Sequence, residues 1–243
     1  MVGTKKEIVE KLRKEIDLLQ GFKPVSAQTI DMGLGPVLSA FPNSVFPIAS
    51  VHEFISDLPE DTAATGGFIA ALLPPLMRSG AACVWISSNR TLFPPSLKAF
   101  GIQPDQILFI DLGRAREVLW ATEEALKCEG LAAVICEIAE IDFIVSRRLQ
   151  LVVEKSGITG FIIRHKPAVL GSTACAARWK ITALPSHQPE DWPGIGFIRW
   201  QVELLKVTNG RPGRWILEWQ ENGMQVIPEY IDTPSTMPQR KIG

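Results

Sequence analysis

The segment from residue 51 to residue 67, VHEFISDLPEDTAATGG, has the order of a strand, a loop and the start of a helix. Ligands of open α/β sheets sit at the carboxyl ends of the strands, so a loop of this kind is where a nucleotide would bind. A phosphate-binding loop needs glycines, a lysine that reaches the β- and γ-phosphates, and a serine or threonine for Mg²⁺. The chain contains no Gly-Lys-Ser or Gly-Lys-Thr triplet. The sequence therefore argues against an ATP site of this type.

The charges of the same loop also oppose phosphate binding. Asp57, Glu60 and Asp61 follow the predicted strand. A carboxylate a few Å from a phosphate costs about 1 kcal/mol in water and several times more at a partly shielded site. Thr65 and Gly66 are the residues that match the end of a phosphate loop. We predict that ATP binds in the millimolar range at best.

The other reactive side chains show no catalytic or metal-binding arrangement. His52 is predicted to be a buried, hydrogen-bonded residue, because no serine or cysteine nucleophile is placed to use it as a base. The cysteines are widely spaced, without a C-x-x-C motif or a histidine at metal-ligand spacing, so we expect reduced core cysteines, no metal and no cofactor. They are Cys83, Cys128, Cys136 and Cys175. Four tryptophans are expected to pack in the core or an interface: Trp120, Trp200, Trp215 and Trp219.

The overall charge limits the contacts that the chain can make with DNA. The 243 residues carry 25 Lys and Arg against 26 Asp and Glu, which excludes a strongly basic nucleic-acid-binding surface. A local basic bias in the last third predicts weak DNA contact through Arg199, Lys206, Arg211 and Arg214. No apolar run approaches the roughly 20 residues of a membrane span, and the N-terminus lacks the pattern of a signal peptide. We expect a cytoplasmic protein.

Short apolar strands alternate with helical segments from Val45 onward. Strands that are apolar on both faces and joined by helices are typical of a doubly wound, mainly parallel α/β sheet. The predicted strands are Ser50–Ile55, Ala82–Ser87, Gln106–Asp111, Leu131–Glu137 and Thr159–His165. The predicted helices are Thr62–Arg78, Pro95–Phe100, Arg114–Cys128 and Phe143–Lys155. Pro74 and Pro75 are expected to kink the first of these helices or end it early.

The pattern changes after His165 to alternating runs separated by turn residues. Such runs predict antiparallel β-hairpins at the C-terminal end of the sheet. They are Arg178–Leu184, Phe197–Val207, Arg214–Gln220 and Met224–Ile227. We place a core with these hairpins at residues 47–232 and a flexible tail at residues 233–243.

The N-terminus predicts an amphipathic helix. Between Thr4 and Leu19, apolar residues recur at helical spacing and form one stripe: Ile8, Leu12, Ile16 and Leu19. We assign residues 1–21 to this helix and residues 22–46, rich in Pro, Gly and Ser, to an extended connector. The helix either folds back on its own core or docks on a partner, which includes a second copy of the chain.

Five segments, taken together, resemble a bacterial protein family. They are VHEF at 51–54, AATG at 63–66, AREVLWATEEALKC at 115–128, SRRLQL at 146–151 and NGRPG at 209–213. In this combination they resemble the family of the error-prone repair protein ImuA, which is RecA-like and SulA-related. The resemblance implies a RecA-like fold and an accessory role in damage-induced mutagenesis (the SOS response) and translesion synthesis. It also implies three partners: an ImuB-like polymerase-related subunit, an error-prone replicative polymerase, and RecA.

The resemblance to RecA places a degenerate nucleotide site in this chain. Ala64 stands where RecA has its phosphate-loop lysine, and Glu137 lies near the position of the metal-binding acid. Arg164 and His165 lie near the position that senses the γ-phosphate. With the residues of the first loop, the implied site is Glu53, Asp57, Glu60, Thr65, Gly66, Glu137 and His165.

Two connections that carry the DNA-binding loops in RecA are short in this sequence. Few residues separate Glu137 from the next predicted helix, and Lys166–Cys175 is also short. The expected function is therefore a non-catalytic scaffold, on which Arg147 and Arg148 are candidates to hold an acidic partner. A SulA-like inhibitor of cell division is the alternative, and an active ATPase or recombinase is less favoured.

Overall fold

The computed structural model describes residues 30–88, 92–187 and 196–227. The predicted N-terminal helix, with Ile8, Leu12, Ile16 and Leu19, lies outside the described residues, as does the tail at 233–243.

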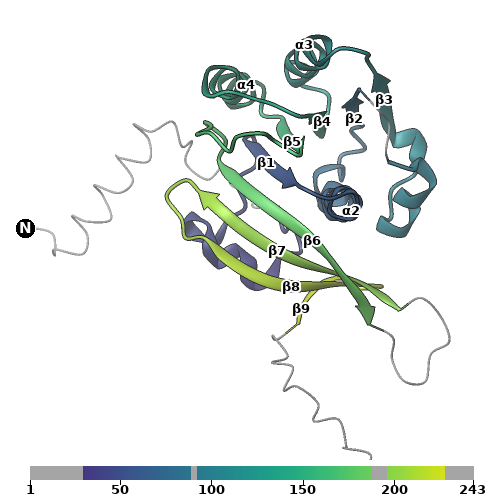
Figure 1. Cartoon of the computed structure of the whole chain (residues 1–243). Helices are drawn as coiled ribbons and strands as arrows, with labels where there is room; N and C mark the ends of the chain where they lie inside the picture. Colours follow the sequence, from purple (N-terminus) through teal and green to yellow (C-terminus); the bar gives the residue numbers. More distant parts are fainter. Residues whose placement is uncertain (1–29, 89–91, 188–195, 228–243) are drawn as a thin grey trace, which may run out of the picture.

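One nine-stranded sheet organises the described chain, in the order β3-β2-β4-β5-β1-β6-β7-β8-β9 (Figure 1). From β3 to β6 all neighbouring strands pair in parallel, and from β6 to β9 they pair antiparallel. The strands are β1 (Val51–Ser56), β2 (Cys83–Ser87), β3 (Ile107–Asp111), β4 (Ala133–Ile138), β5 (Thr159–His165), β6 (Ala177–His187), β7 (Phe197–Val207), β8 (Gly213–Gln220) and β9 (Gly223–Ile227). The predicted parallel sheet and its C-terminal hairpins are both confirmed.

Helices cover both faces of the parallel strands, with α2 on one face and α3 and α4 on the other (Figure 1). The α-helices are α2 (Pro59–Leu76), α3 (Ala115–Leu126) and α4 (Phe143–Ser156), and the 3-10 helices are η1 (Gly35–Ala40), η2 (Pro42–Ser44), η3 (Pro94–Phe100) and η4 (Pro104–Gln106). The segment predicted as a helix at Pro95–Phe100 is thus a 3-10 helix. Helix α2 ends at Leu76, directly after Pro74 and Pro75, because two prolines remove successive backbone donors.

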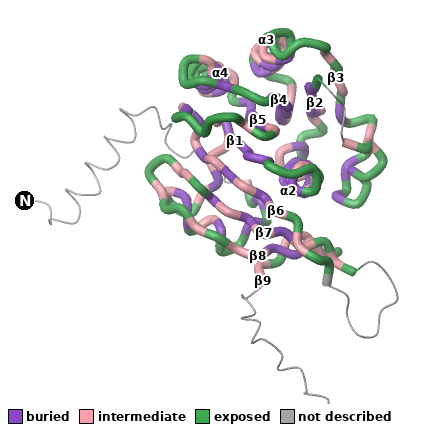
Figure 2. The backbone as a smooth tube through the Cα atoms, viewed as in Figure 1, coloured by how far each residue is buried: buried purple, intermediate pink, exposed green. Residues whose placement is uncertain are grey.

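Alternation along the strands sends neighbouring side chains into two separate cores. On β2, Trp85 packs in the core under α2, whereas Val84 and Ile86 pack in the core under α3 and α4. Strands β1, β2 and β4 are buried along their whole length (Figure 2). Residues next to each other on a strand therefore belong to different environments.

The described part of the predicted connector, residues 30–46, is packed rather than extended. It forms η1 and η2, and Met32, Leu34 and Phe46 are buried in the core on the α2 face. The NGRPG turn lies against it, because the Arg211 amide donates to the Ala40 carbonyl at 2.8 Å. A β-carbon at Gly210 would overlap that same carbonyl, so this glycine is required by close packing of the backbone.

Candidate functional site

A cavity of about 1060 Å³ opens on the α2 face of the sheet. It lies at the carboxyl ends of β1, β2, β4 and β5, where ligands of α/β sheets bind. Apolar side chains from η3, β6 and β7 form most of one wall, and polar groups gather where α2 begins. Its lining includes Ser56, Leu58, Glu60, Thr62, Ala63, Ala64, Gly66, Trp85, Phe93, Phe100, Glu137, Ile163, His165, Ile198 and Trp200.

The polar end of the cavity is a chain of hydrogen bonds. The hydroxyls of Ser56 and Thr62 are 2.7 Å apart, and Thr62 Oγ1 is 3.4 Å from His165 Nδ1. His165 Nε2 lies 3.1 Å from Glu137 Oε2, and the Trp85 indole donates to Glu137 Oε1 at 2.5 Å. Glu137 is buried, and His165 and Trp85 hold its carboxylate in place. Thr62 and Trp85 were not identified by sequence reasoning.

The loop that lines the cavity lacks the lysine that would hold a triphosphate. Ala64, at the expected lysine position, and Gly66 line it, but Thr65 does not. Thr65 is fully buried, and its hydroxyl has no hydrogen-bond partner in the described structure. Asp57 accepts a hydrogen bond from Lys180 at 2.6 Å, while the buried Asp61 accepts one from the Ala183 amide at 3.3 Å. Besides the Ser56 and Thr62 hydroxyls, the side chains that the loop offers are therefore carboxylates and apolar groups.

Glu53 does not belong to this cavity. Its side chain lies on the opposite face of the sheet, fully buried, where it accepts from Arg164 at 2.8 Å and from Arg178 at 2.7 Å. Thr173 donates to it as well, at 2.7 Å. The expectation that Glu53, Glu137 and His165 share one site is therefore wrong, because alternation along the strands separates Glu53 from the other two. An arginine that ends the apolar run GFII at 160–163 was the available sequence signal for this ionic cluster.

The two short connections are tied to that ionic cluster. Glu140, in the connection between β4 and α4, accepts from Arg164 at 2.7 Å and from the Ala168 amide at 2.7 Å. Arg164 and Arg178 also donate to the carbonyls of Val169 and Gly171 in the connection between β5 and β6. Both connections are thereby fixed to the end of the sheet.

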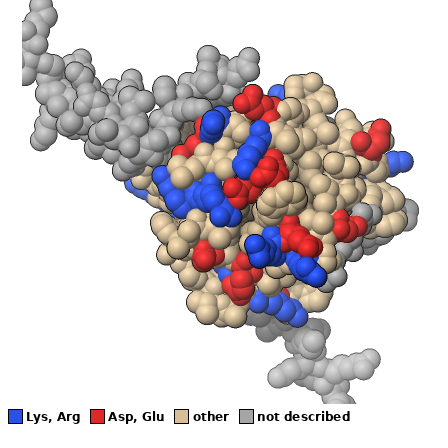
Figure 3. Space-filling view, turned by 90° about the horizontal axis from the view of Figure 1, so that it is seen from above, with Lys and Arg blue, Asp and Glu red and all other residues tan. Residues whose placement is uncertain are grey.

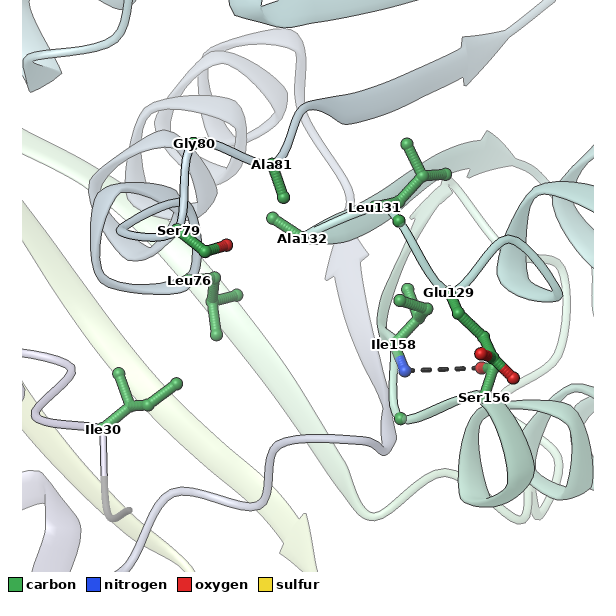
Figure 4. A pocket seen from close by; sticks show the side chains of 12 residues that line it. Ile30, Leu76, Ser79, Gly80, Ala81, Glu129, Leu131, Ala132, Ser156 and Ile158 are labelled. Atoms are coloured by element: carbon green, nitrogen blue, oxygen red, sulfur yellow. Dashed lines mark hydrogen bonds between the residues drawn. The ribbon is translucent and has the colours of Figure 1, made fainter.

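A second, smaller pocket lies at the opposite end of the parallel strands (Figure 4). It is formed by the residues that follow α2 and precede β2, β4 and β5, among them Gly80, Ala132 and Ile158. One side-chain hydrogen bond joins two of its lining residues, from the Ile158 amide to the Ser156 hydroxyl at 3.3 Å. The described residues around it offer no convergent set of reactive side chains.

His52 is buried and hydrogen-bonded, as predicted. Its Nε2 lies 2.8 Å from the Pro47 carbonyl oxygen, and the Trp179 indole donates to its Nδ1 at 3.3 Å. The ring stacks on Phe46 with 4.4 Å between ring centroids. Burial among these aromatic rings lowers the pKa of His52 to about 4. The residue is neutral and structural.

The cysteines and tryptophans only partly follow the sequence prediction. All four cysteines are free, and burial raises the pKa of Cys83, Cys136 and Cys175 to about 12. Cys128 is exposed, because it follows the last turn of α3. Trp200 is a core residue, but Trp120 is 65 % exposed on α3. The expectation of core packing was therefore wrong for Cys128, and Trp120 is free for an interface.

Most of the basic side chains predicted to contact DNA or a partner form ion pairs or hydrogen bonds within the chain. Arg199 pairs with Glu218 at 2.6 Å and Arg214 with Glu203 at 3.2 Å, while Lys206 donates to the Thr173 carbonyl at 2.7 Å. Arg147 and Arg148 on α4 pair with Glu154 and Glu123. Figure 3 shows lysine and arginine side chains lying among aspartate and glutamate side chains on the face seen from above.

In the described part of the chain, no helix is both long and apolar enough to cross a membrane. No group of three or more His, Cys, Asp or Glu side chains is placed there to hold a metal ion.

Solved structures identify the fold. The chain is similar to the RadB recombinase, with a TM-score of 0.56 and 12 % identity over 82 % of this chain and 100 % of that one. It is also similar to a KaiC-like protein from the hyperthermophilic archaeon Pyrococcus horikoshii, with a TM-score of 0.53 and 12 % identity over 84 % and 100 % of the two chains. The sheet with its C-terminal hairpins is a RecA-like fold.

Sequence relatives identify the family. No family model matches the chain. The proteins named ImuA from Caulobacter vibrioides strains NA1000 and CB 15 are each 34 % identical to it over 206 residues, which cover 80 % of this chain and 84 % of the relative. At that identity and coverage, the chain belongs to the ImuA family.

Proposed function

We propose that this protein is a non-catalytic accessory of mutagenic DNA repair that scaffolds an error-prone polymerase assembly in the cytoplasm. Membership of the ImuA family carries the proposal. The absence of a catalytic role is supported by the cavity itself, where Ala64 replaces the expected lysine and carboxylates replace phosphate ligands. A protein that neither binds nor hydrolyses ATP acts through the surfaces it presents to its partners.

The proposed partners are an ImuB-like polymerase-related subunit, an error-prone replicative polymerase and RecA. Exposed apolar side chains mark surfaces suited to partner proteins. Trp120 on α3 is 65 % exposed, and Ile144 on α4, beside the predicted contacts Arg147 and Arg148, is 76 % exposed. The N-terminal stripe of Ile8, Leu12, Ile16 and Leu19 is the second proposed contact, with RecA or a second copy of the chain.

Direct contact with DNA is proposed to be weak. Arg199, Lys206 and Arg214 already have partners within the chain, so few cations of the predicted C-terminal cluster remain to neutralise phosphates. Binding affinity falls with salt at a slope of about 0.9 per phosphate contact on duplex DNA. A small number of contacts gives both weak binding and a shallow slope.

Capture experiments with the purified full chain test the proposal. The immobilised chain should retain the ImuB-like subunit, the replicative polymerase or RecA. Retention of the cell-division GTPase and none of these would favour the SulA-like alternative. Titration calorimetry with MgATP supplies the second test, and a low micromolar dissociation constant would contradict the non-catalytic assignment.

A further inference from the structure

The cavity on the α2 face keeps the position of a nucleotide site but has a different chemistry. Leu58, Phe93 and Ile198 line it and are 51 %, 67 % and 41 % exposed. Deeper apolar side chains, including Phe100 and Trp200, are buried. Its volume of about 1060 Å³ is that of a site for a drug-sized ligand. Large apolar side chains left exposed at the mouth of a cavity mark it as a binding surface.

The charges around the cavity disfavour an ionic ligand. Of the charged groups that line it, Asp57 is paired with Lys180, Arg199 with Glu218, and Glu137 with its indole and imidazole neighbours. The other two, Glu60 and Lys166, have opposite charges and are exposed to water at the mouth of the cavity. A ligand charge inside the cavity would lose its water without gaining a matched partner at the paired groups, and exposed charges such as Glu60 and Lys166 add little because water screens them. The cavity is therefore suited to a neutral ligand.

The polar end offers one place for a hydrogen-bonding group. Thr62 Oγ1 and His165 Nδ1 are 3.4 Å apart, which is long for a hydrogen bond between a hydroxyl and a ring nitrogen. A ligand hydroxyl beside them could donate to Thr62 Oγ1 at a shorter distance, because the Thr62 proton goes to the Leu58 carbonyl and leaves this oxygen able to accept. The Thr62 hydroxyl would keep its contacts with Ser56 and the Leu58 carbonyl.

We propose that this cavity binds a neutral, largely apolar ring compound that carries one hydroxyl group. The ring lies against the apolar wall formed by η3 and Trp200, and its polar group lies at Thr62 and His165. This site is independent of the proposed repair function, since it concerns a ligand and not a protein partner.

Three probes of one ring system test the chemistry on the full chain. Naphthalene, 2-naphthol and 2-naphthyl phosphate differ only in their polar group, and calorimetry or equilibrium dialysis measures their binding. We expect 2-naphthol to bind most tightly, with naphthalene about tenfold weaker, because one net hydrogen bond is worth about that factor. The phosphate should bind at least tenfold more weakly than 2-naphthol. Equal or tighter binding of the phosphate overturns the proposal, as does the absence of 2-naphthol binding up to its solubility limit.

Substitutions at exposed alanines locate the site without disturbing the core. Ala63 on α2 and Ala183 on β6 are exposed and line the cavity, so Ala63→Trp and Ala183→Trp should each lower 2-naphthol affinity at least tenfold. Ala115→Trp, at an exposed position on α3 outside the cavity, is the matched control and should change nothing. Unchanged binding in both cavity variants, with unchanged melting temperatures, overturns the assignment.

A last variant tests the polar end. Thr62→Val should bring the affinity for 2-naphthol down to that for naphthalene and leave naphthalene binding unchanged. A general loss of structure would weaken both probes, whereas loss of the hydrogen bond weakens one. If 2-naphthol still binds about tenfold more tightly than naphthalene, the proposed orientation is wrong.

Discussion

The two faces of the sheet differ at the carboxyl ends of its parallel strands. On the face of α3 and α4, Glu53 is fully buried and both of its carboxylate oxygens are engaged by arginines. On the face of α2, the same strand ends open into a cavity with apolar walls. Arg164 and His165 are consecutive in the sequence, yet Arg164 belongs to the ionic cluster and His165 lines the cavity. One face is closed by charge pairing, and the other is left open for a ligand.

This difference shows that the ends of the same strands can place buried, structural ion pairs on one face and solvent-accessible side chains on the other. Consecutive strand residues point to opposite faces, so two titratable neighbours can have unrelated roles. In this chain the buried Arg164 holds the connections after β4 and β5 in place, through Glu140 and the Val169 carbonyl. The accessible groups at the cavity are linked by hydrogen bonds that run from Ser56 through Thr62 and His165 to Glu137.

The largest effect is expected at Glu53, where it tests whether charge pairing closes the face of α3 and α4. Glu53→Gln leaves Arg164, which is 1 % exposed, with less negative charge nearby. Removing one partner of a buried ion pair costs about 3–5 kcal/mol. We expect urea denaturation to show a loss of that size. Glu154→Gln, which removes the partner of the exposed Arg147, is the control and should change stability by less than about 1 kcal/mol. A loss below about 1 kcal/mol in Glu53→Gln would mean that charge pairing does not close this face.

The pH dependence of stability should report the titration of His52, a buried group on the α2 face. Its pKa is about 4 in the folded protein, against about 6.5 in an unfolded chain. The unfolded chain therefore binds the proton first as the pH falls. The contribution of His52 is complete above about pH 6.5 and is lost as the pH falls toward 4, with a total of about 3 kcal/mol. Urea midpoints measured from pH 7.5 to 4.5 should show this slope.

The variant His52→Gln removes the titration and keeps an acceptor and a donor near Trp179 and Pro47. We expect it to flatten the slope between pH 6.5 and 4.5, even where it lowers stability at every pH. An unchanged slope would assign the acid sensitivity to other groups.

A smaller effect is expected at Thr65, where α2 carries a buried hydroxyl without a partner in the described structure. An unsatisfied buried polar group costs about 1–3 kcal/mol. Thr65→Val keeps the shape and removes that hydroxyl, so we expect stability to rise by about 1 kcal/mol. Thermal unfolding measures it, and Thr122→Val, which removes a hydroxyl bonded to the Val118 carbonyl at 2.7 Å, is the matched comparison. A loss of stability in Thr65→Val would show that the hydroxyl is satisfied in solution.

The architecture was largely predictable because its signals are local. Runs that are apolar on both faces located the strands β1 to β5 within about two residues of their observed ends. The turn residues at 208–213 and 221–223 located the hairpins. Helix type was less predictable at Pro94–Phe100, where a 3-10 helix replaces the predicted helical segment.

The site was less predictable because it depends on which face each side chain occupies. Sequence order placed Glu53, Glu137 and His165 near one another, but only the paired register of β1, β4 and β5 separates them by face. The role of Arg178 was missed for the same reason, since its contact with Glu53 joins residues that are 125 positions apart. Cys128 was assigned to the core with the other cysteines, and it is exposed.

The smallest effect is expected at Arg148. It sharpens the comparison because the distance between Arg148 and Glu123 alone would not predict a weak ion pair. Arg148 lies 2.7 Å from Glu123, the same separation as between Arg178 and Glu53. The Arg148 side chain is 54 % exposed, against 12 % for Arg178, and solvent-exposed pairs contribute about 0–1 kcal/mol. A double-mutant cycle with Arg148→Ala and Glu123→Ala should give a coupling energy below about 0.5 kcal/mol, decreasing with salt. A coupling above about 2 kcal/mol would show that burial is not what separates the two pairs. If folding is undisturbed, loss of partner capture by Arg148→Ala reports recognition directly, and unchanged capture removes Arg148 from the proposed contact surface.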